Sequence, residues 1–141
     1  VDLKGLGERA ILVDCDVMQA DGGTRTASIT GACVAVALAL KKLADAGKLP
    51  KGGLDTVLID TVAAISVGMK KGEVLVDLDY NEDSSCDVDM NFVVTGKGGF
   101  VEVQGTAEKH SFTKPELDQM TEGALGAIAQ IKKIQAAAIK M

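Results

Sequence analysis

The chain has few aromatic residues: it contains no tryptophan, one tyrosine and three phenylalanines in 141 residues. This argues against a platform on which nucleic-acid bases stack. Positive charge is also scarce, because 15 lysine and arginine residues face 20 aspartate and glutamate residues and leave a net charge of −5. Since RNA binding depends strongly on cations that meet phosphates, we expect this chain alone to bind RNA poorly.

The patterns of zinc sites and disulfide frameworks are missing as well. His110 is the only histidine, and the three cysteines, Cys15, Cys33 and Cys86, include no CxxC pair. No zinc ligand set is therefore expected, and His110 is interpreted as an ordinary loop residue. The odd cysteine count favours a reduced, cytoplasmic chain without disulfides. Cys15 and Cys33 fall in periodic apolar segments and are expected to be buried.

No continuous run of about 18 apolar residues occurs, and the start of the chain lacks a signal-peptide pattern, so no membrane partner is expected. With 141 residues, of which 47% are hydrophobic, the chain is long enough for one domain with a core. It begins at Val1 rather than at methionine. We interpret this start as a sign of a processed or excerpted product.

Apolar periodicity predicts a strand followed by a helix in the first part of the chain. Apolar and polar residues alternate over residues 10–18, as in a half-buried strand. A stripe at helical spacing then covers residues 29–43, and Gly47 ends the predicted helix. The first unit is therefore predicted to be a strand, a tight glycine turn and a helix.

Two β-hairpins and a final helix are predicted in the rest of the chain. Residues 57–69 should pair with residues 73–80 across a lysine–glycine turn. Residues 90–95 should pair with residues 100–105 across a glycine-rich turn. The sequence TKPE at 113–116 is a capping-box pattern and marks the start of the last helix. These patterns together predict one α/β (α+β) domain with antiparallel hairpins.

The glycine turn between the first strand and the first helix reads DGGTRTAS over residues 21–28. Its glycines let a ligand approach the backbone closely, and free N–H groups at a helix start favour an oxyanion. Arg25 adds a planar, permanently charged fork that matches phosphate oxygens. The turn is not a P-loop, since GxxxxGK[ST] is absent. The pattern fits either a phosphate site or a plain capped turn with a surface arginine.

Acidic residues gather between the two predicted hairpins, at Asp77, Asp79, Glu82, Asp83, Asp87 and Asp89. Carboxylates concentrated in this way can hold a divalent cation such as Mg²⁺ together with waters. Such a cation would stabilise negative charge on a phosphoryl group or a departing oxygen. A solvated acidic loop is the alternative. The functional interpretation gains weight from the glycine turn, because phosphorolysis needs both an anion site and metal or acid chemistry.

Five segments resemble bacterial ribonuclease PH. Residues 13–32 (VDCDVMQADGGTRTASITGA) are similar to its signature almost letter for letter. Residues 77–80 (DLDY), 82–84 (EDS), 89–91 (DMN) and 102–108 (EVQGTAE) continue the likeness in the same order. Polynucleotide phosphorylase and archaeal exosome subunits share parts of the pattern. The resemblance implies that residues 1–141 are the C-terminal portion of a single ribonuclease PH domain.

The resemblance also implies a fold, an activity and a site. The fold would be the β-α-β arrangement of ribosomal protein S5 domain 2, incomplete at the N-terminus. The activity would be that of a tRNA nucleotidyltransferase, a phosphorolytic 3′→5′ exoribonuclease that trims tRNA precursors with inorganic phosphate and releases nucleoside diphosphates. Phosphate contacts would fall on Gly23, Thr24 and Arg25, with Arg25 also catalytic. The catalytic and metal-associated aspartates would be Asp77 and Asp83.

Partners follow from the same resemblance. The family acts in tRNA and rRNA processing and assembles as a homo-hexamer, a trimer of dimers, here expected in the cytoplasm with Mg²⁺ as cofactor. Its members carry a long N-terminal part with a second phosphate-contacting arginine and much of the basic RNA-binding surface. We expect that missing segment to be a partner of this chain. Its basic surface would explain how an acidic chain can belong to an RNA-processing enzyme.

Several alternatives stay open at the level of sequence. In the leading hypothesis Asp83 binds Mg²⁺, and Asp77 is a second ligand or the acid for the departing 3′ oxygen, although the two roles could be exchanged. A non-catalytic ring or scaffold subunit of an exosome-like assembly is the alternative function. The presence of Arg25 and both aspartates favours the enzyme. A third hypothesis is a fragment that is inert, or that folds only beside the missing part.

Overall fold

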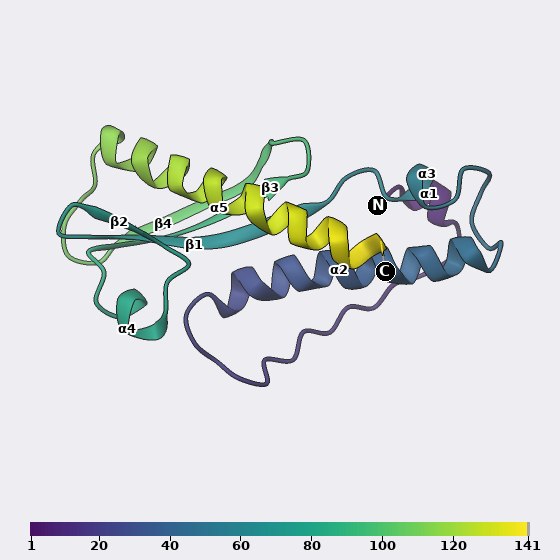
Figure 1. The fold of residues 1–141 in the computed structure, drawn as a ribbon, viewed down its shortest axis with the longest axis horizontal. Helices are drawn as coiled ribbons and strands as arrows, with labels where there is room; N and C mark the ends of the chain where they lie inside the picture. The colour runs from purple at the N-terminus through teal and green to yellow at the C-terminus, as the bar shows by residue number, and fades with distance from the viewer. Residues whose placement is uncertain (141) are drawn as a thin grey trace.

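A four-stranded antiparallel sheet and two long helices dominate the computed structural model, which describes residues 1–140 (Figure 1). The sheet order β2-β1-β3-β4 is formed by β1 (Val62–Lys70), β2 (Glu73–Val76), β3 (Val88–Thr95) and β4 (Phe100–Ala107). The helices are α1 (Leu3–Leu6), α2 (Thr24–Asp45), α3 (Leu54–Val57), α4 (Tyr80–Asp83) and α5 (Lys114–Lys140). The predicted mixed α and β fold is confirmed.

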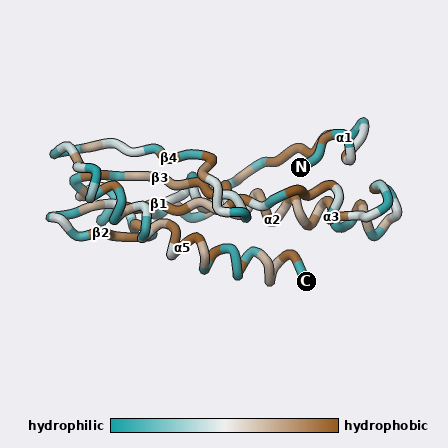
Figure 2. Tube along the Cα trace, turned by 90° about the horizontal axis from the view of Figure 1, so that it is seen from above, coloured by the Kyte–Doolittle hydropathy of each residue, from teal (hydrophilic) through white to brown (hydrophobic). Residues whose placement is uncertain are grey.

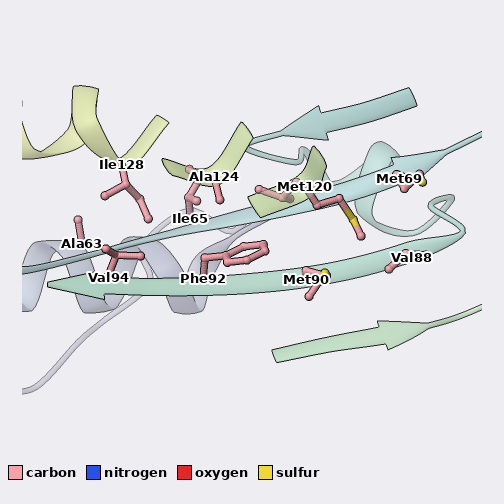
Figure 3. Packing of buried hydrophobic residues seen from close by; sticks show 11 residues of the cluster. Ala63, Ile65, Met69, Val88, Met90, Phe92, Val94, Met120, Ala124 and Ile128 are labelled. Carbon is pink, nitrogen blue, oxygen red and sulfur yellow. The ribbon is translucent and has the colours of Figure 1, made fainter. Parts of the chain in front are cut away.

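Helix α5 packs on one face of the sheet and forms the main hydrophobic core with it. Met120, Ala124 and Ile128 recur every four residues along α5 and are buried. Figure 3 shows their side chains pointing toward Phe92 and Val94 of β3. The other buried members come from β1 and β3 and are Ala63, Ile65, Val67, Met69, Val88 and Met90. Since each large apolar side chain contributes about 1.5–3 kcal/mol on burial, this layer stabilises the sheet and α5 together.

Local sequence signals predict the pairing of both hairpins and the start of the last helix, although β1 begins at Val62 rather than at Val57, which belongs to α3. Strands β1 and β2 pair antiparallel across the lysine–glycine turn, and β3 pairs antiparallel with β4. The predicted capping box is present: the Thr113 N–H donates to Glu116 Oε2 at 2.6 Å, and the Glu116 N–H donates to Thr113 Oγ1 at 3.4 Å. Helix α5 then continues for 27 residues without a break.

Helix side chains bond to the part of the β1 edge that β2 leaves unpaired. Strand β2 pairs with β1 only as far as Val67, so backbone groups beyond that point need other partners. Thr30 Oγ1 donates to the Ala64 carbonyl at 3.2 Å and accepts from the Ala64 N–H at 3.0 Å. Gln135 Nε2 donates to the carbonyls of Thr30 and Val62 at 3.0 and 2.9 Å. These bonds fix α2 alongside β1.

The start of α2 and the segment 77–87 lie over the sheet face opposite α5. Ser66 and Gly68 alternate along β1 with core residues and therefore point to this second face. A Cβ at Gly23 would lie 3.1 Å from Ser66 Oγ, and a Cβ at Gly68 would lie 2.5 Å from Cys86 Sγ. The close approaches show that both segments rest directly on the strand.

A small second hydrophobic cluster lies at the other end of α2, away from the sheet (Figures 1 and 2). It buries Leu6 of α1, Leu40 of α2 and Val57 of α3. The Asp2 N–H donates to the Val57 carbonyl at 2.8 Å and ties the N-terminus to α3. The molecule is therefore elongated, and α2 runs from the sheet, where it packs beside β1, to this second cluster.

The strand predicted over residues 10–18 is wrong. The segment runs as irregular chain along α2 (Figure 1) and joins no sheet within residues 1–140. Leu12 and Met18 are 95% and 94% exposed, and Cys15, expected to be buried, is exposed too. Alternation predicts an extended chain, but a strand also needs a neighbour for its backbone hydrogen bonds. No pattern in the segment itself supplies that neighbour.

The returning strand of the first hairpin is shorter than its alternation predicts. Strand β2 ends at Val76, and Tyr80, the predicted strand end, instead begins α4. Asp77 has a left-handed backbone with φ 65°, which turns the chain away from β1. The short helices α3 and α4 are not predicted by the sequence.

By length and composition alone, α2 could cross a membrane, since its mean hydropathy over an 18-residue window is 1.5. The apolar residues of α2 are interrupted by small and polar residues, so the helix contains no continuous run of about 18 apolar residues. In the structure α2 packs against β1, with Thr30 bonded to the strand.

Candidate functional site

Helix α2 starts without a cap on the second face of the sheet. Its N-cap residue, Gly23, has φ 69° and ψ 24° and makes no side-chain cap hydrogen bond. The side-chain bonds at the helix start go to carbonyls: Thr26 Oγ1 donates to the Gly23 carbonyl at 2.8 Å, and Ser28 Oγ donates to the Thr24 carbonyl at 2.8 Å. The first N–H groups of any helix lack intrahelical partners. Those of Thr24, Arg25 and Thr26 belong to this first turn, which contains no acidic residue. The arrangement leaves N–H donors and the positive dipole end for an external oxyanion.

Arg25 in this first turn is paired with Glu102 of β4. Arg25 Nη1 donates to Glu102 Oε1 at 2.8 Å and Nη2 donates to Oε2 at 2.9 Å. The hydrogen bond to Glu102 raises the pKa of the Arg25 guanidinium, and the same bond lowers the pKa of the Glu102 carboxyl. The guanidinium therefore already holds a bidentate carboxylate, the geometry in which arginine binds oxyanions. The sequence did not predict this contact.

The glycine turn and the acidic segment touch each other. A Cβ at Gly22 would lie 1.9 Å from the Leu78 carbonyl oxygen, so only glycine fits there. Asp21 Oδ1 accepts from the Gly22 N–H at 2.9 Å and from the Tyr80 N–H at 2.7 Å. The turn and the acidic segment, far apart in the sequence, therefore share one location on the second face.

Three of the six clustered acids have structural roles. Asp79 caps α4 and forms a capping box with Glu82, through bonds of 2.8 and 3.1 Å. Asp87 Oδ2 accepts from the Lys71 N–H at 2.8 Å, and Asp87 Oδ1 lies 3.4 Å from Lys109 Nζ. The backbone bond from Lys71 is the main reason that the pKa of Asp87 is lowered. These three carboxylates are occupied in holding the segment.

The remaining acids are Asp77, Asp83 and Asp89. Within residues 1–140, the carboxylates of Asp77 and Asp83 accept no hydrogen bond. Asp77 follows β2 in a left-handed conformation, and its N–H donates to the Ser66 carbonyl at 2.9 Å. This bond places Asp77 beside β1 where the glycine turn lies. The two aspartates assigned from the resemblance are thus carboxylates without an evident structural role.

Asp89 is a further candidate that sequence reasoning placed in the cluster without a role. Burial is the main reason that the pKa of Asp89 is raised, and the negative charges of Asp83 and Glu108 raise this pKa further. Its side chain alternates with the core residues Val88 and Met90 along β3, so it points to the second face. That alternation is the sequence signal that could have separated Asp89 from the surface acids.

Asp77 and Glu102 mark two sides of the site. Asp77 flanks β1 at Ser66, whereas Glu102 lies on β4, with β1 and β3 between them. At a strand spacing of about 4.8 Å, their backbones are about 14 Å apart across the strands, and Glu102 is also displaced two residues along β4 from Gln104, which is level with Ser66. The start of α2 over Ser66 lies near Asp77, and the Arg25 side chain extends from there toward β4. The cationic and acidic parts therefore share one face without direct contact.

A complete metal cage is not present in the described part of the chain: no three His, Cys, Asp or Glu side chains converge there. A Mg²⁺ ion commonly needs only one or two carboxylates, together with waters and substrate phosphates. The negative charges of Asp83 and Asp89 repel each other, and a bound cation would reduce this repulsion. Two carboxylates are enough for a loosely held divalent cation that keeps waters, and Asp83 and Asp89 are the pair that fits this requirement.

An open groove adjoins the glycine turn. It has a volume of about 480 Å³ and lies between the irregular segment 13–19 and α2. Asp21, Gly22 and Thr24 line its end, and Gly31 and Ala35 line it further along the helix. The groove gives access to the start of α2 from solvent.

Comparison with known proteins supports the fold. Residues 60–127 match the family model described as 3′ exoribonuclease family, domain 2. The match includes Asp77, Asp83 and Glu102 and stops short of Arg25. The crystal structure of rice (Oryza sativa) Rrp46 is similar with a TM-score of 0.62 and 19% identity, covering 86% of this chain and 50% of that chain. At this identity the likeness establishes the fold.

Two further solved structures show a weaker likeness. The Archaeoglobus fulgidus exosome with RNA bound to the active site has a TM-score of 0.47 and 14% identity, covering 52% of this chain and 29% of that chain. An archaeal exosome core has a TM-score of 0.49 and 13% identity, covering 55% of this chain and 31% of that chain. The present chain spans half the length of the rice Rrp46 chain. The predicted fold class is confirmed by the family match and by Rrp46.

Proposed function

We propose that this chain contributes the phosphate site and the acidic site of a phosphorolytic 3′→5′ exoribonuclease of the ribonuclease PH type. The observation that carries the proposal is the contact between the uncapped start of α2 and the acidic segment, through Gly22 against Leu78 and through the Asp21–Tyr80 hydrogen bond. The match to a 3′ exoribonuclease family over residues 60–127 supports the same reaction class. Trimming of tRNA precursors is the specific activity that we propose.

The reaction assigns a task to each part of the site. An oxygen of inorganic phosphate attacks the phosphorus of the last phosphodiester bond of RNA. The bond from that phosphorus to the preceding 3′ oxygen breaks, a nucleoside diphosphate is released, and the 3′ oxygen takes up a proton. The backbone of Gly23 and Thr24 and the guanidinium of Arg25 would hold the attacking phosphate. Asp77 would donate the proton or complete the acidic site beside Asp83.

Magnesium is the cofactor that we propose for the acidic side of this site. Asp83 would hold it, with Asp77 or the neighbouring Asp89 as a second carboxylate. When bound, the ion would supply electrostatic stabilisation of charge that builds up on the phosphoryl group and the departing oxygen. Without a cation these carboxylates repel the phosphates of RNA, so the proposed activity should require divalent metal.

The test is phosphate-dependent release of nucleoside diphosphate from a short RNA with a 3′ extension. Removing a group that stabilises transition-state charge commonly lowers the rate by about a hundredfold or more, and we expect this loss in Arg25→Ala and in Asp83→Asn. Glu122→Gln, which removes a charge from exposed α5 on the other side of the sheet, should leave release unchanged. Unchanged release in both site variants, with folding intact, would refute the assignment.

RNA and other subunits would complete the particle. The net charge of −5 makes this chain a poor partner for RNA by itself, so the basic surface would come from a further segment of the same kind of domain. We propose a homo-hexamer, arranged as a trimer of dimers, in the cytoplasm. Mass measurement of the purified particle would show both the subunit number and any accompanying polypeptide.

A non-catalytic scaffold subunit of an exosome-like assembly is the second candidate. Val101 and Val103 are 60% and 47% exposed on β4, the edge strand of the sheet. An apolar edge strand of this kind is a surface for pairing with another chain. A particle that binds RNA but releases no nucleoside diphosphate, with or without phosphate, would favour this candidate.

A further inference from the structure

The ion pair between Arg25 and Glu102 connects two elements that are otherwise held apart. Arg25 belongs to the first turn of α2, and Glu102 lies 77 residues later on β4. Both terminal nitrogens of the guanidinium are engaged, at 2.8 and 2.9 Å. The Arg25 side chain is 52% exposed and the Glu102 side chain 35% exposed. An exposed pair contributes little to stability, so stability alone gives a weak reason for this contact.

The position of Arg25 at the start of a helix favours an orienting partner. A cation in the first turn of a helix is repelled by the positive end of the helix dipole, and the first turn of α2 has no acidic residue to offset it. Without a partner, the long side chain would be free to move away from the helix start. Glu102 holds it from a strand that is paired in the sheet, which fixes where the guanidinium lies.

The pair leaves donors free. A guanidinium has five N–H groups, and the bidentate bond to Glu102 uses one on Nη1 and one on Nη2. The Nε–H and one N–H on each terminal nitrogen remain. The Nε side of the fork can therefore bind an oxyanion while the end of the fork stays on Glu102.

We propose that Glu102 is a positioning residue for phosphate: it holds the end of the Arg25 guanidinium and thereby presents the Nε edge to an oxyanion at the start of α2. This inference rests on the proposed function, since it concerns the same phosphate site. Its opposite is that Glu102 competes with phosphate for Arg25 and must be displaced. The two possibilities differ in sign, which makes them separable by one measurement.

Two effects of Glu102→Gln on phosphate binding have opposite signs: the loss of a negative charge and the loss of the orientation of Arg25. Replacing Glu102 by glutamine removes a negative charge near the anion and, by charge alone, would tighten phosphate binding. It also removes the bidentate partner, because an amide offers only one oxygen acceptor. Weaker phosphate binding in Glu102→Gln can then arise only from the lost orientation of Arg25. The cost of ordering one long side chain predicts a weakening of about three- to tenfold.

The experiment is a titration with inorganic phosphate, followed through the backbone amide signals of Thr24, Arg25 and Thr26 in heteronuclear NMR spectra of the full chain. We expect saturable shifts at these amides in the wild-type chain, an unchanged dissociation constant in Glu122→Gln, and a weaker one in Glu102→Gln. The exchanged pair Arg25→Glu with Glu102→Arg should keep the link between α2 and β4 and the thermal midpoint. It should not bind phosphate at these amides, because the arginine then starts from β4.

The outcomes separate the inference from the function on which it rests. Equal or tighter binding in Glu102→Gln, with Arg25→Ala still abolishing it, would overturn the positioning role and leave the phosphate site standing. Absence of phosphate binding in the wild-type chain would overturn the phosphate site itself. If Glu102→Gln loses its dispersed spectrum, Glu102→Asp decides: it keeps the negative charge but shortens the side chain, so unchanged phosphate binding in that variant contradicts the positioning role. Phosphate binding retained in the exchanged pair would instead overturn the assignment of Arg25 to the phosphate site.

Discussion

At the scale of single residues, Asp77 combines an unfavourable backbone with an unpaired carboxylate. Its φ of 65° is the left-handed conformation, which costs most residues about 1–2 kcal/mol and glycine almost nothing. A residue kept in such a conformation at a proposed active site is consistent with selection for its side chain rather than for stability. The backbone fixes the carboxylate where β2 ends and the segment over the second face begins.

Two substitutions at Asp77 separate backbone from side chain. We expect Asp77→Gly to be about 1 kcal/mol more stable than Asp77→Ala, because glycine accepts the left-handed conformation and alanine does not. Both variants should lose phosphorolysis, since both lack the carboxylate. Denaturant unfolding of the two variants measures the difference in free energy. Equal stability would mean that the backbone at position 77 is not left-handed in solution.

The raised pKa of Asp89 predicts that the stability of the protein depends on pH. Burial and the charges of Asp83 and Glu108 raise its pKa above the ordinary value of 3.8. A raised folded-state pKa means that the folded protein binds the proton more tightly than the unfolded chain, so ionised Asp89 lowers stability at neutral pH. This penalty disappears as the pH falls through the folded-state pKa.

The Asp89→Asn variant should therefore melt at a higher temperature than wild type at pH 7, and the gain should shrink at pH 4. Thermal unfolding at the two pH values measures it. Asp83→Asn removes one source of repulsion and should reduce the gain that Asp89→Asn gives at pH 7. A gain of the same size at both pH values would show that Asp89 titrates normally.

At the scale of elements, two glycines give opposite predictions for the same change. A Cβ at Gly22 would lie 1.9 Å from the Leu78 carbonyl oxygen, whereas a Cβ at Gly31, in the middle of α2, meets nothing within 4 Å. Gly22→Ala should separate the glycine turn from the acidic segment, lowering stability and abolishing phosphate-dependent release. Gly31→Ala should raise stability by about 0.5–1 kcal/mol, because alanine is the better helix former.

Denaturant unfolding and the release assay on the two glycine variants test this pair together. Because both variants add the same methyl group, a difference between them reports on the contact between Gly22 and Leu78. Full activity in Gly22→Ala would show that the turn and the acidic segment need not touch for function.

The elements that the sequence predicts well are those specified by neighbouring residues. The capping box at Thr113 and the turn signals of the two hairpins lie within a few residues of the structures that they define. The segment 10–18 fails because its alternation does not contain the strand that would pair with it. Strand β2 ends early because the conformation of Asp77 is set by contacts with β1, which alternation does not encode.

The candidate site also contains features that neighbouring residues specify and features that depend on contacts between distant residues. The proposed phosphate residues and the two proposed catalytic aspartates come from short motifs and from the resemblance that these motifs carry, and their roles stay predictions. The partner of Arg25 is not, because Glu102 lies on a different strand and meets it only when the sheet has formed. The structural roles of Asp79, Glu82 and Asp87 also need coordinates, since composition alone makes all six acids equivalent.

At the scale of the whole molecule, the two hydrophobic clusters differ greatly in size. The cluster between the sheet and α5 buries eleven residues, whereas the one formed by α1, α2 and α3 buries three. Local opening free energies follow buried apolar contacts. We therefore expect the end with α1 and α3 to open without unfolding the sheet, and the functional site to belong to the more stable part.

Hydrogen exchange on two alanine variants tests this division. Leu40→Ala removes a fully buried side chain from the small cluster, and Met120→Ala removes one from the large cluster. Each substitution creates a cavity that should lower the free energy of unfolding of the surrounding cluster by about 2–5 kcal/mol. We expect Leu40→Ala to speed exchange in α1 and α3 and leave β1 and β3 almost unchanged, and Met120→Ala to speed exchange throughout the sheet. Equal acceleration of β1 and β3 in both variants would mean that the two clusters unfold as one unit, since α2 would then transmit the loss from one end to the other.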